Sequence, residues 1–167
     1  MRIGIDIDET ITETKESFYR ILKKYNIDYK DEYINWIHSD LYHEIVVHLD
    51  EMFIDLKLKE DVKEVLDYLS SEGHELIAIT ARSNYYSQNV IDITKKYILD
   101  NNLNISNIYF KQNKKSDIAK ELKIDLMIDD SIDVYNNMKE EGIDCILFGD
   151  KIKTWKQVLE YIKAKEE

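Results

Sequence analysis

The stretch Arg2-Ile3-Gly4-Ile5-Asp6-Ile7-Asp8-Glu9-Thr10 decides the fold of this chain. It opens as an apolar, β-branched run, which is the pattern of a strand buried on both faces. Asp6 and Asp8 follow at a spacing of two residues, and a strand that ends at Asp6 places both near its carboxyl end. Two unpaired carboxylates there are costly unless a cation or a proton lies between them. Two interpretations follow: a solvated turn, or a metal-assisted active site at the edge of a parallel sheet.

The composition is typical of a soluble globular protein with one sizeable core. The 167 residues are 44% hydrophobic and 34% charged, and the formal net charge is −11. This acidity argues against binding to long nucleic acid, which needs a basic surface. It allows a small phosphorylated ligand, because a metal and a lysine can reverse the field at one site. Neither a membrane-spanning run nor a signal-peptide pattern occurs, so we expect a cytoplasmic protein with no membrane partner.

The cysteine and histidine residues do not indicate a catalytic thiol or a zinc site. The single cysteine, Cys145, lies in an apolar run and cannot form an internal disulfide, which favours a reducing compartment. We interpret it as a small buried strand residue. His38, His43 and His48 are spaced five residues apart and do not share one helical face, so a metal cluster is not expected.

Strands and helices alternate along the chain after residue 57. Strands are expected at 75–79, 107–110, 126–128 and 143–148, and helices at 61–71, 84–99, 116–122, 134–141 and 155–164. Together with the first strand, this alternation predicts an α/β protein. The expected architecture is a three-layer α/β/α sandwich around a mainly parallel, Rossmann-like sheet with right-handed crossovers.

Residues 12–56 interrupt the alternation with a helical block. Helices are expected at 12–25, 31–37 and 40–53. The block is rich in aromatic residues, namely Phe18, Tyr19, Tyr25, Tyr29, Tyr33, Trp36, Tyr42 and Phe53. A simple crossover needs no such block, so we predict a small helical cap inserted into a core made of residues 1–11 and 57–167. Cap aromatics such as Phe18, Tyr19, Tyr33 and Trp36 could stack on a nucleobase, although packing explains each of them more simply.

Polar groups follow several predicted strands or lie in nearby loops. In chain order they are Asp6, Asp8 and Thr10, then Thr80, then Lys114 and Lys115, then Asp129, Asp130 and Asp133. The carboxyl ends of parallel strands meet at one edge of a sheet, so these groups could come together. Carboxylates, a hydroxyl and an ammonium suit a phosphoryl group with Mg²⁺, which prefers oxygen ligands. A carboxylate can also attack phosphorus as a nucleophile.

In this order the motifs resemble those of the haloacid dehalogenase (HAD) superfamily of phosphatases. The matching residues are Asp6-Ile7-Asp8-Glu9-Thr10, Thr80, Lys115 and Asp129-Asp130-Ser131-Ile132-Asp133. The resemblance covers nearly the whole chain and puts the helical block at the position of the family's C1 cap. Within the family, Ile79-Thr80-Ala81-Arg82 and Ile128-Asp129-Asp130-Ser131 look most like 5′-nucleotidases of the 5′(3′)-deoxyribonucleotidase type.

The resemblance implies a Mg²⁺-dependent phosphomonoesterase that forms an aspartyl-phosphate. Asp6 would be the nucleophile and a metal ligand. Asp8 would be the general acid and then the general base, and would lend its backbone carbonyl to the metal. Asp129 would be the remaining protein ligand, and Asp130 or Asp133 would complete the metal's shell through water. Two nearby carboxylates can divide roles in this way when only one of them faces a cation.

The resemblance also implies which residues contact the substrate, a small phosphate ester such as a nucleoside monophosphate. Thr80 and Lys115 would bind the phosphate. Thr10, Ala81 and Arg82 are further candidates for substrate binding, and a structural ion pair is the alternative for Arg82. Lys114 could replace Lys115, but the spacing to Asp129 favours Lys115.

Glu9 departs from the family pattern, which commonly has glycine at this position. Glycine permits an unusual backbone or a close approach of the cap. A glutamate would restrict the turn and add negative charge beside a phosphate site. We expect this change to bear on the choice of substrate more than on catalysis.

Two other functions compete with a phosphatase. A signalling receiver domain also combines carboxylates, a hydroxyl, a lysine and Mg²⁺ around an acceptor aspartate, but its acidic pair comes early in the chain and it has no place for the 12–56 block. A catalytically idle binding module could keep the fold. The presence of both Asp6 and Asp8 argues against it.

Overall fold

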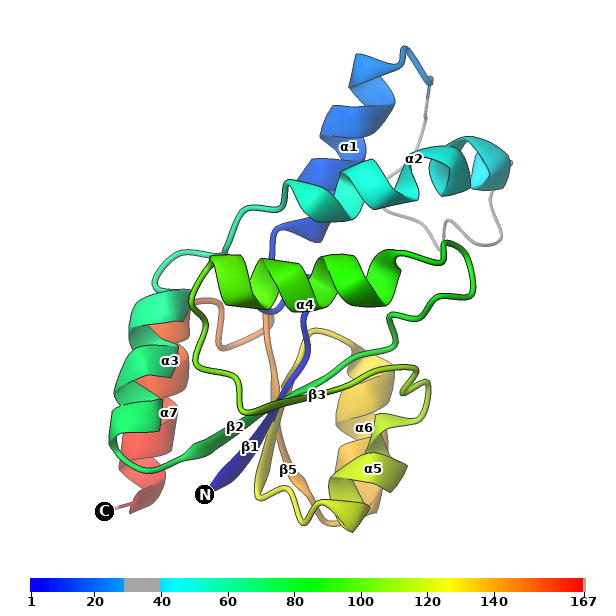
Figure 1. The fold of residues 1–167 in the computed structure, drawn as a ribbon. Coiled ribbons are helices and arrows are strands. Elements are labelled where there is room, and N and C mark those ends of the chain that lie inside the picture. The colour runs from blue at the N-terminus through cyan, green and yellow to red at the C-terminus, as the bar shows by residue number, and fades with distance from the viewer. Residues whose placement is uncertain (29–39, 167) are drawn as a thin grey trace.

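The protein is built on a five-stranded parallel sheet (Figure 1). The computed structural model describes residues 1–28 and 40–166. The strands are β1 (Arg2–Ile5), β2 (Glu75–Ile79), β3 (Asn107–Tyr109), β4 (Leu126–Asp129) and β5 (Asp144–Leu147). Their order is β3-β2-β1-β4-β5, and every neighbouring pair is parallel. The predicted α/β class with a parallel sheet is therefore confirmed, and β1 occupies the centre that its apolar run requires.

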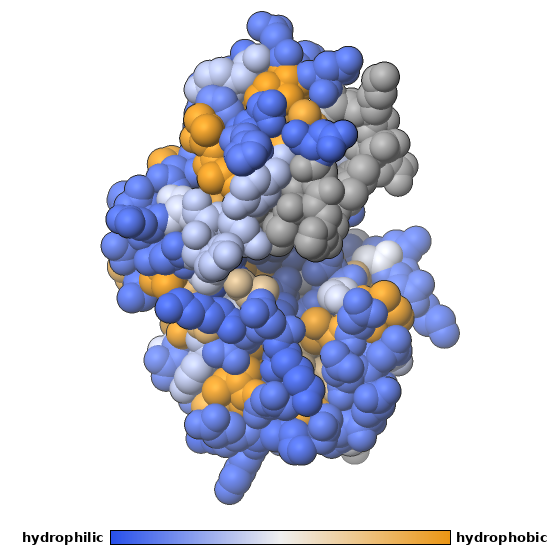
Figure 2. Space-filling view, turned by 90° about the vertical axis from the view of Figure 1, so that its right-hand side faces the viewer, coloured by the Kyte–Doolittle hydropathy of each residue, from blue (hydrophilic) through white to orange (hydrophobic). Residues whose placement is uncertain are grey.

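Helices cover both faces of this sheet. On one face lie α3 (Val62–Ser71) and α7 (Trp155–Glu166), and on the other lie α5 (Lys115–Glu121) and α6 (Ile132–Glu140). Gly4 in β1 has no room for a side chain, because a Cβ there would meet the Sδ of Met127 on the neighbouring strand β4 at 2.7 Å. The surface in Figure 2 is mostly hydrophilic. Within the described ranges, none of the helices has both the length and the apolar character needed to cross a membrane.

One predicted helix begins later than the sequence pattern indicates. The pattern predicts a helix over 84–99, whereas α4 spans Val90–Asp100. The side chain of Asn84 accepts a hydrogen bond from the backbone N–H of Ile91, and Ser87 accepts one from the N–H of Asn89. These local bonds stabilise turns in place of the first helical turns.

The segment of residues 12–56 forms α1 (Thr14–Lys24) and α2 (Tyr42–Ile54), which lie beyond one end of the sheet in Figure 1. Their apolar faces pack on each other and on α4. This cluster comprises Phe18, Ile21, Leu22, Ile45, Leu49, Met52, Phe53, Leu56, Val90 and Tyr97. Phe18 thus serves packing, as the simpler explanation predicted, and Phe53 lies in the same cluster. The predicted helix at 31–37 and the residues Tyr29, Tyr33, Trp36 and His38 lie outside the described residues.

The two connections to this segment run side by side. The N–H of Glu13 donates to the carbonyl of Lys57 at 2.8 Å, and the N–H of Lys59 donates to the carbonyl of Ile11 at 2.9 Å. Thr12 and Leu58 form an antiparallel bridge between them. The chain therefore leaves the sheet region and returns to it at one point, next to the loop that follows β1.

Candidate active site

Lys115 joins the ends of the two central strands. Its Nζ lies 2.5 Å from Oδ1 of Asp6, just after β1, and 2.6 Å from Oδ2 of Asp129, at the end of β4. The backbone N–H of Asp6 donates to the carbonyl of Ile128, so the register of β1 and β4 sets this approach. The side chains are almost fully buried, with 7% of Lys115 and 1% of Asp129 exposed. Lys114, by contrast, is exposed and pairs with Asp117 at 3.1 Å.

Burial and charge shape the electrostatics of this trio. Burial raises the pKa of Asp6 well above its ordinary value, and the charges of Asp129 and Asp8 add to the rise while Lys115 opposes it. Burial would lower the pKa of Lys115, but Asp6 and Asp129 together raise it above its ordinary value. One ammonium thus faces two buried carboxylates, and the surplus negative charge favours a further cation.

Three carboxylates stand close enough to hold a metal ion together. Asp6, Asp129 and Asp130 each offer a carboxylate oxygen, and these oxygens lie within 4.8 Å of one another. Asp130 is the exposed member of this group. Partial burial of its carboxyl group, together with the adjacent charge of Asp129, raises its pKa to about 6. An all-oxygen donor set fits Mg²⁺. Among the described residues, the carboxylate of Asp8 is not part of this group, and neither is the exposed Asp133.

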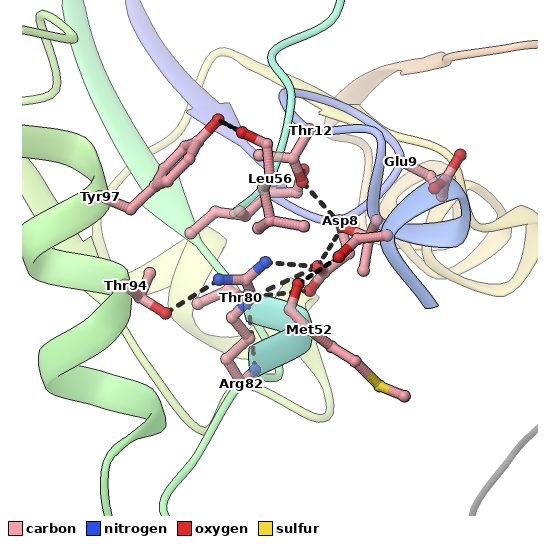
Figure 3. Close-up of polar contacts among 12 residues, drawn as sticks. Asp8, Glu9, Thr12, Met52, Leu56, Thr80, Arg82, Thr94 and Tyr97 are labelled. Carbon is pink, nitrogen blue, oxygen red and sulfur yellow. Dashed lines mark hydrogen bonds and ion pairs between the residues drawn. The ribbon is translucent and has the colours of Figure 1, made fainter. Parts of the chain in front are cut away.

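Asp8 is held by a different partner from that of Asp6. Arg82 donates from Nε to Oδ2 of Asp8 at 3.0 Å and from Nη2 to Oδ1 at 2.6 Å (Figure 3). The hydroxyl of Thr14, the first residue of α1, donates to Oδ1 at 2.7 Å. Burial would raise the pKa of Asp8, but the Arg82 charge and the hydrogen bonds from Arg82 and Thr14 lower it. The pKa values of Asp6 and Asp8 are therefore shifted in opposite directions, raised for Asp6 and lowered for Asp8. This is the reverse of what an ionised nucleophile and a protonated acid need, and a cation bound beside Asp6 would lower its pKa.

Arg82 also contacts the helices α4 and α2. Its Nη1 donates to the hydroxyl of Thr94 on α4 at 2.9 Å, and the ring of Phe53 on α2 lies 4.1 Å from its Cζ. Of the two interpretations of Arg82, the structure contains the ion pair, which Arg82 forms with Asp8. A contact between Arg82 and a substrate phosphate stays a prediction. Sequence reasoning missed Thr14 and Thr94, because a lone threonine on an expected helix gives no signal of an inward contact.

The remaining candidate residues lie around this centre. The hydroxyl of Thr80 accepts a hydrogen bond from the N–H of Arg82 at 3.2 Å, and its side chain is buried where β2 ends. Thr10 is fully buried, and its hydroxyl has no partner among the described residues. Ala81 is exposed beside Thr80. Their roles in substrate binding stay predictions.

Glu9 takes the backbone conformation that glycine favours. Its φ is 58°, in the left-handed region, where most side chains are strained. Its carboxylate points to the start of α1 and accepts a hydrogen bond from the N–H of Lys15, and it lies 3.7 Å from the Nζ of Lys59. The side chain therefore binds the connections to the α1–α2 segment, a role that its place in the motif did not predict.

The strand order argues against a receiver domain. Flavodoxin-like receivers have the order 2-1-3-4-5, with the first strand next to the third. Here β1 lies between β2 and β4. The acidic residues Asp6 and Asp129 therefore meet on adjacent central strands, in a different fold from that of a receiver.

No protein-family model matches this sequence, and no curated protein matches it. Solved structures do match. A HAD-superfamily hydrolase from Ehrlichia chaffeensis has a TM-score of 0.58 at 15% identity, covering 99% of this chain and 97% of that one. A HAD-superfamily hydrolase of subfamily IA, variant 1, from Geobacter sulfurreducens PCA has a TM-score of 0.62 at 14% identity, with coverage of 96% and 98%.

A third match is a predicted phosphoglycolate phosphatase from Haemophilus somnus 129PT, with a TM-score of 0.65 at 14% identity over 96% of this chain and 97% of that one. None of the three names mentions a nucleotidase, so the narrower resemblance to 5′-nucleotidases gains no support from them. Identities this low establish the fold and not the activity. The chain has the fold of the HAD-superfamily hydrolases.

Proposed function

We propose that this protein is a Mg²⁺-dependent phosphomonoesterase that acts through an aspartyl-phosphate. The observation that carries the proposal is the bridge from Lys115 to Asp6 and Asp129 at 2.5 and 2.6 Å, with Asp8 held separately by Arg82. Buried carboxylates arranged in this way suit phosphoryl transfer, in which positioning and charge neutralisation do most of the work.

In the proposed reaction, an oxygen of Asp6 attacks the phosphorus of the ester. The bond from phosphorus to the leaving oxygen breaks, and Asp8 gives that oxygen its carboxyl proton, so an alcohol departs. Water then attacks the aspartyl-phosphate as Asp8 takes its proton. The bond between phosphorus and Asp6 breaks, which releases inorganic phosphate and restores both carboxyl groups. Lys115 and Thr80 would hold the phosphoryl oxygens during both steps.

The acidic group would supply the metal site. Asp6, Asp129 and Asp130 would hold Mg²⁺, and the backbone carbonyl of Asp8 is a further candidate ligand. The bound ion would neutralise charge on the transferring phosphoryl group. The surplus of carboxylates over ammonium groups supports this assignment.

The α1–α2 segment is proposed to act as a cap over residues 1–11 and 57–167, and to take part in choosing the substrate. A cavity of about 650 Å³ opens next to Ala81. Tyr85, Lys111 and Asn113 are among the residues that line it, so an aromatic ring, a cation and an amide are available there. These groups could contact a planar, polar leaving group of a small phosphate ester, and a nucleoside monophosphate is the proposed example.

Phosphate release tests the proposed function. Wild type, Asp6→Asn and the matched control Lys114→Met are compared with Mg²⁺ on a panel of mononucleotides, sugar phosphates and p-nitrophenyl phosphate. We expect turnover by wild type and Lys114→Met, and a loss of at least about a thousandfold in Asp6→Asn because the nucleophile is removed. Equal rates in wild type and Asp6→Asn would exclude Asp6 as the nucleophile. A phospho-form that persists for hours without turnover would indicate a phospho-acceptor.

A further inference from the structure

The cavity beside Ala81 lies at the carboxyl ends of two neighbouring strands. The connection after β2 supplies Ala81 and residues 83–86 of its lining, and the connection after β3 supplies Lys111 and Asn113. β2 and β3 pair in the sheet, so these two connections start side by side (Figure 1). The cavity is therefore next to Thr80, and none of its described lining residues belongs to α1 or α2.

The lining of this cavity is basic in a protein whose formal net charge is −11. Lys111 is one of the lining residues, and no carboxylate is among those that the structure describes there. Within residues 1–28 and 40–166, Lys111 is exposed and forms no ion pair, whereas Lys114 pairs with Asp117 at 3.1 Å. An ammonium that no neighbouring carboxylate neutralises attracts an anion into a concave surface.

The polar side chains near Lys111 have hydrogen-bond donors left to offer. The Oδ1 of Asn84 accepts from the N–H of Ile91 at 2.9 Å, which leaves the amide hydrogens of Asn84 available. The Oγ of Ser83 accepts from the N–H of Tyr85 at 3.3 Å, which leaves its hydroxyl proton available. Donors beside an ammonium suit an ionised carboxylate or phosphate, whose charged oxygens accept hydrogen bonds.

The backbone fixes Lys111 to the residues that follow β2. Its N–H donates to the carbonyl of Arg82 at 3.0 Å, and the N–H of Gln112 donates to the carbonyl of Thr80 at 2.9 Å. The φ of Lys111 is 62°, in the left-handed region that glycine favours. Lys123 has a φ of 54°, but it follows the end of helix α5, where this conformation is common. Lys111 follows a strand, so its conformation is a local strain beside the candidate site.

We propose that Lys111 binds a second anionic group of the substrate, separate from the phosphate that the enzyme removes. This inference rests on the proposed phosphatase function and narrows it to phosphate monoesters whose leaving group carries a carboxylate or a further phosphate. Thr80 and Lys115 would hold the phosphoryl group, and Lys111 would hold the second anion in the neighbouring cavity. Lys111 takes no part in bond changes and determines which ester binds.

Matched pairs of esters test the proposed preference. Glycerol 3-phosphate is compared with 3-phosphoglycerate, which adds a carboxylate, and thymidine 5′-monophosphate with thymidine 3′,5′-bisphosphate, which adds a phosphate. We expect a KM about tenfold lower for the doubly anionic ester of one pair, with similar kcat, because a charge-assisted contact is added in binding. The pair that shows the difference identifies the second anion. Equal KM values within both pairs would overturn the inference.

Variants of Lys111 show whether it causes the preference. Lys111→Met should raise the KM of the doubly anionic ester about tenfold and change that of its partner ester by less than about twofold. Lys111→Arg should keep the preference, because the charge remains. Lys123→Met is the matched control, since Lys123 shares the residue type and the left-handed φ but does not line the cavity. An equal rise in KM for both esters in Lys111→Met would assign Lys111 to the hydrolysed phosphate and refute the proposal.

Lys111→Gly separates the side chain from the backbone conformation. Glycine adopts a φ of 62° without strain, so this variant should melt at the wild-type temperature or above it. It should nevertheless lose the preference for the doubly anionic ester, because the ammonium is gone. A glycine variant that keeps the full preference would show that the Lys111 side chain does not bind the second anion.

Binding to Asp6→Asn gives a readout without turnover. Titration calorimetry with both pairs of esters should show a Kd about tenfold lower for the doubly anionic ester, and this difference should disappear when Lys111→Met is added. It should also shrink as sodium chloride screens the contact. A difference that survives Lys111→Met would contradict the inference. If the wild type hydrolyses none of the esters while the Lys111-dependent difference in Kd persists, the proposed function is wrong and the anion site remains.

Discussion

The carboxylate of Glu9 accepts a hydrogen bond of 2.6 Å from the backbone N–H of Lys15. Lys15 is the second residue of α1, and Glu13, which precedes the helix, provides no side-chain cap. Glu9 therefore satisfies one of the free N–H groups at the helix start from five residues before it, and adds negative charge where the helix dipole favours it. It does so at the cost of a φ of 58°.

Variants of Glu9 separate these two effects. Glu9→Ala should lower the free energy of unfolding by about 1–2 kcal/mol, because the cap is lost and the left-handed backbone remains. Glu9→Gly should be less destabilising than Glu9→Ala by about 1 kcal/mol, because glycine adopts this φ without strain. Urea denaturation measures both values. A glycine variant as unstable as the alanine variant would show that the backbone conformation at residue 9 carries no strain.

Lys115 should matter to stability as well as to activity. Lys115→Met leaves Asp6 and Asp129 buried without their shared cation, and we expect a loss of about 3–5 kcal/mol in unfolding free energy with metal chelated. Mg²⁺ should restore part of this loss, because a second cation is supplied to the same carboxylates. Lys114→Met should stay within about 0.5 kcal/mol of wild type in the same urea titrations. Equal effects of the two substitutions would contradict this account.

Asp130 and Asp133 should differ in their effect on metal binding. Asp130 belongs to the acidic group with Asp6 and Asp129, whereas the exposed Asp133 does not. We expect Asp130→Asn to weaken Mg²⁺ affinity by at least about tenfold and Asp133→Asn by less than about threefold. Titration calorimetry gives the affinities, and the rise in melting temperature with Mg²⁺ provides a check. A larger effect from Asp133→Asn would assign it, and not Asp130, to the metal's shell.

Asp144 should make stability depend on pH. Burial acts to raise its pKa, but hydrogen bonds from Lys165, Tyr161 and Lys139 lower it from 3.8 to about 2. A carboxyl group with a lowered pKa in the folded state stabilises the protein above its ordinary pKa, and this contribution is lost as pH falls from about 4 to 2. Allowing for solvent screening, Asp144→Asn should destabilise the protein by about 1 kcal/mol at pH 7 and by almost nothing at pH 2.

The control for Asp144 is Asp100→Asn, since Asp100 is exposed on α4 and pairs with Lys96 four residues before it. Its effect should stay within about 0.5 kcal/mol at both pH values. Urea titrations of both variants at several pH values provide the comparison. A destabilisation by Asp144→Asn that stays constant from pH 7 to pH 2 would rule out the ion pairs as its cause.

The periodic parts of the fold could be predicted from the sequence. β2 spans Glu75–Ile79, as its apolar run predicted, and α1, α3 and α7 begin or end within two residues of their predicted limits. These elements each bury one pattern of side chains, so local periodicity specifies them. The helix predicted at 84–99 was wrong only over residues 84–89, because hydrogen bonds accepted by Asn84 and Ser87 outweigh periodicity there.

The centre of the candidate site could also be anticipated, because Asp6, Lys115 and Asp129 each lie at or beside the end of a strand or the start of a helix in a parallel sheet. The surroundings of Asp8 could not. Arg82 is 74 residues away along the chain, and its orientation depends on Thr94 and Phe53, which belong to two other helices. A local sequence pattern cannot predict the contact between Arg82 and Asp8, because residues from separate elements of the fold determine it.

The paired connections at Thr12 and Leu58 have a consequence for how this chain can change. A segment that enters and leaves at one point can be lengthened, shortened or exchanged without breaking the register of any strand in the sheet. A short hairpin could close the gap between the two connections. The limit is α4, since Val90 and Tyr97 pack against α1 and α2 and would be exposed to water if the segment were removed. Any replacement segment must therefore supply an apolar face for α4 and a new contact for Arg82.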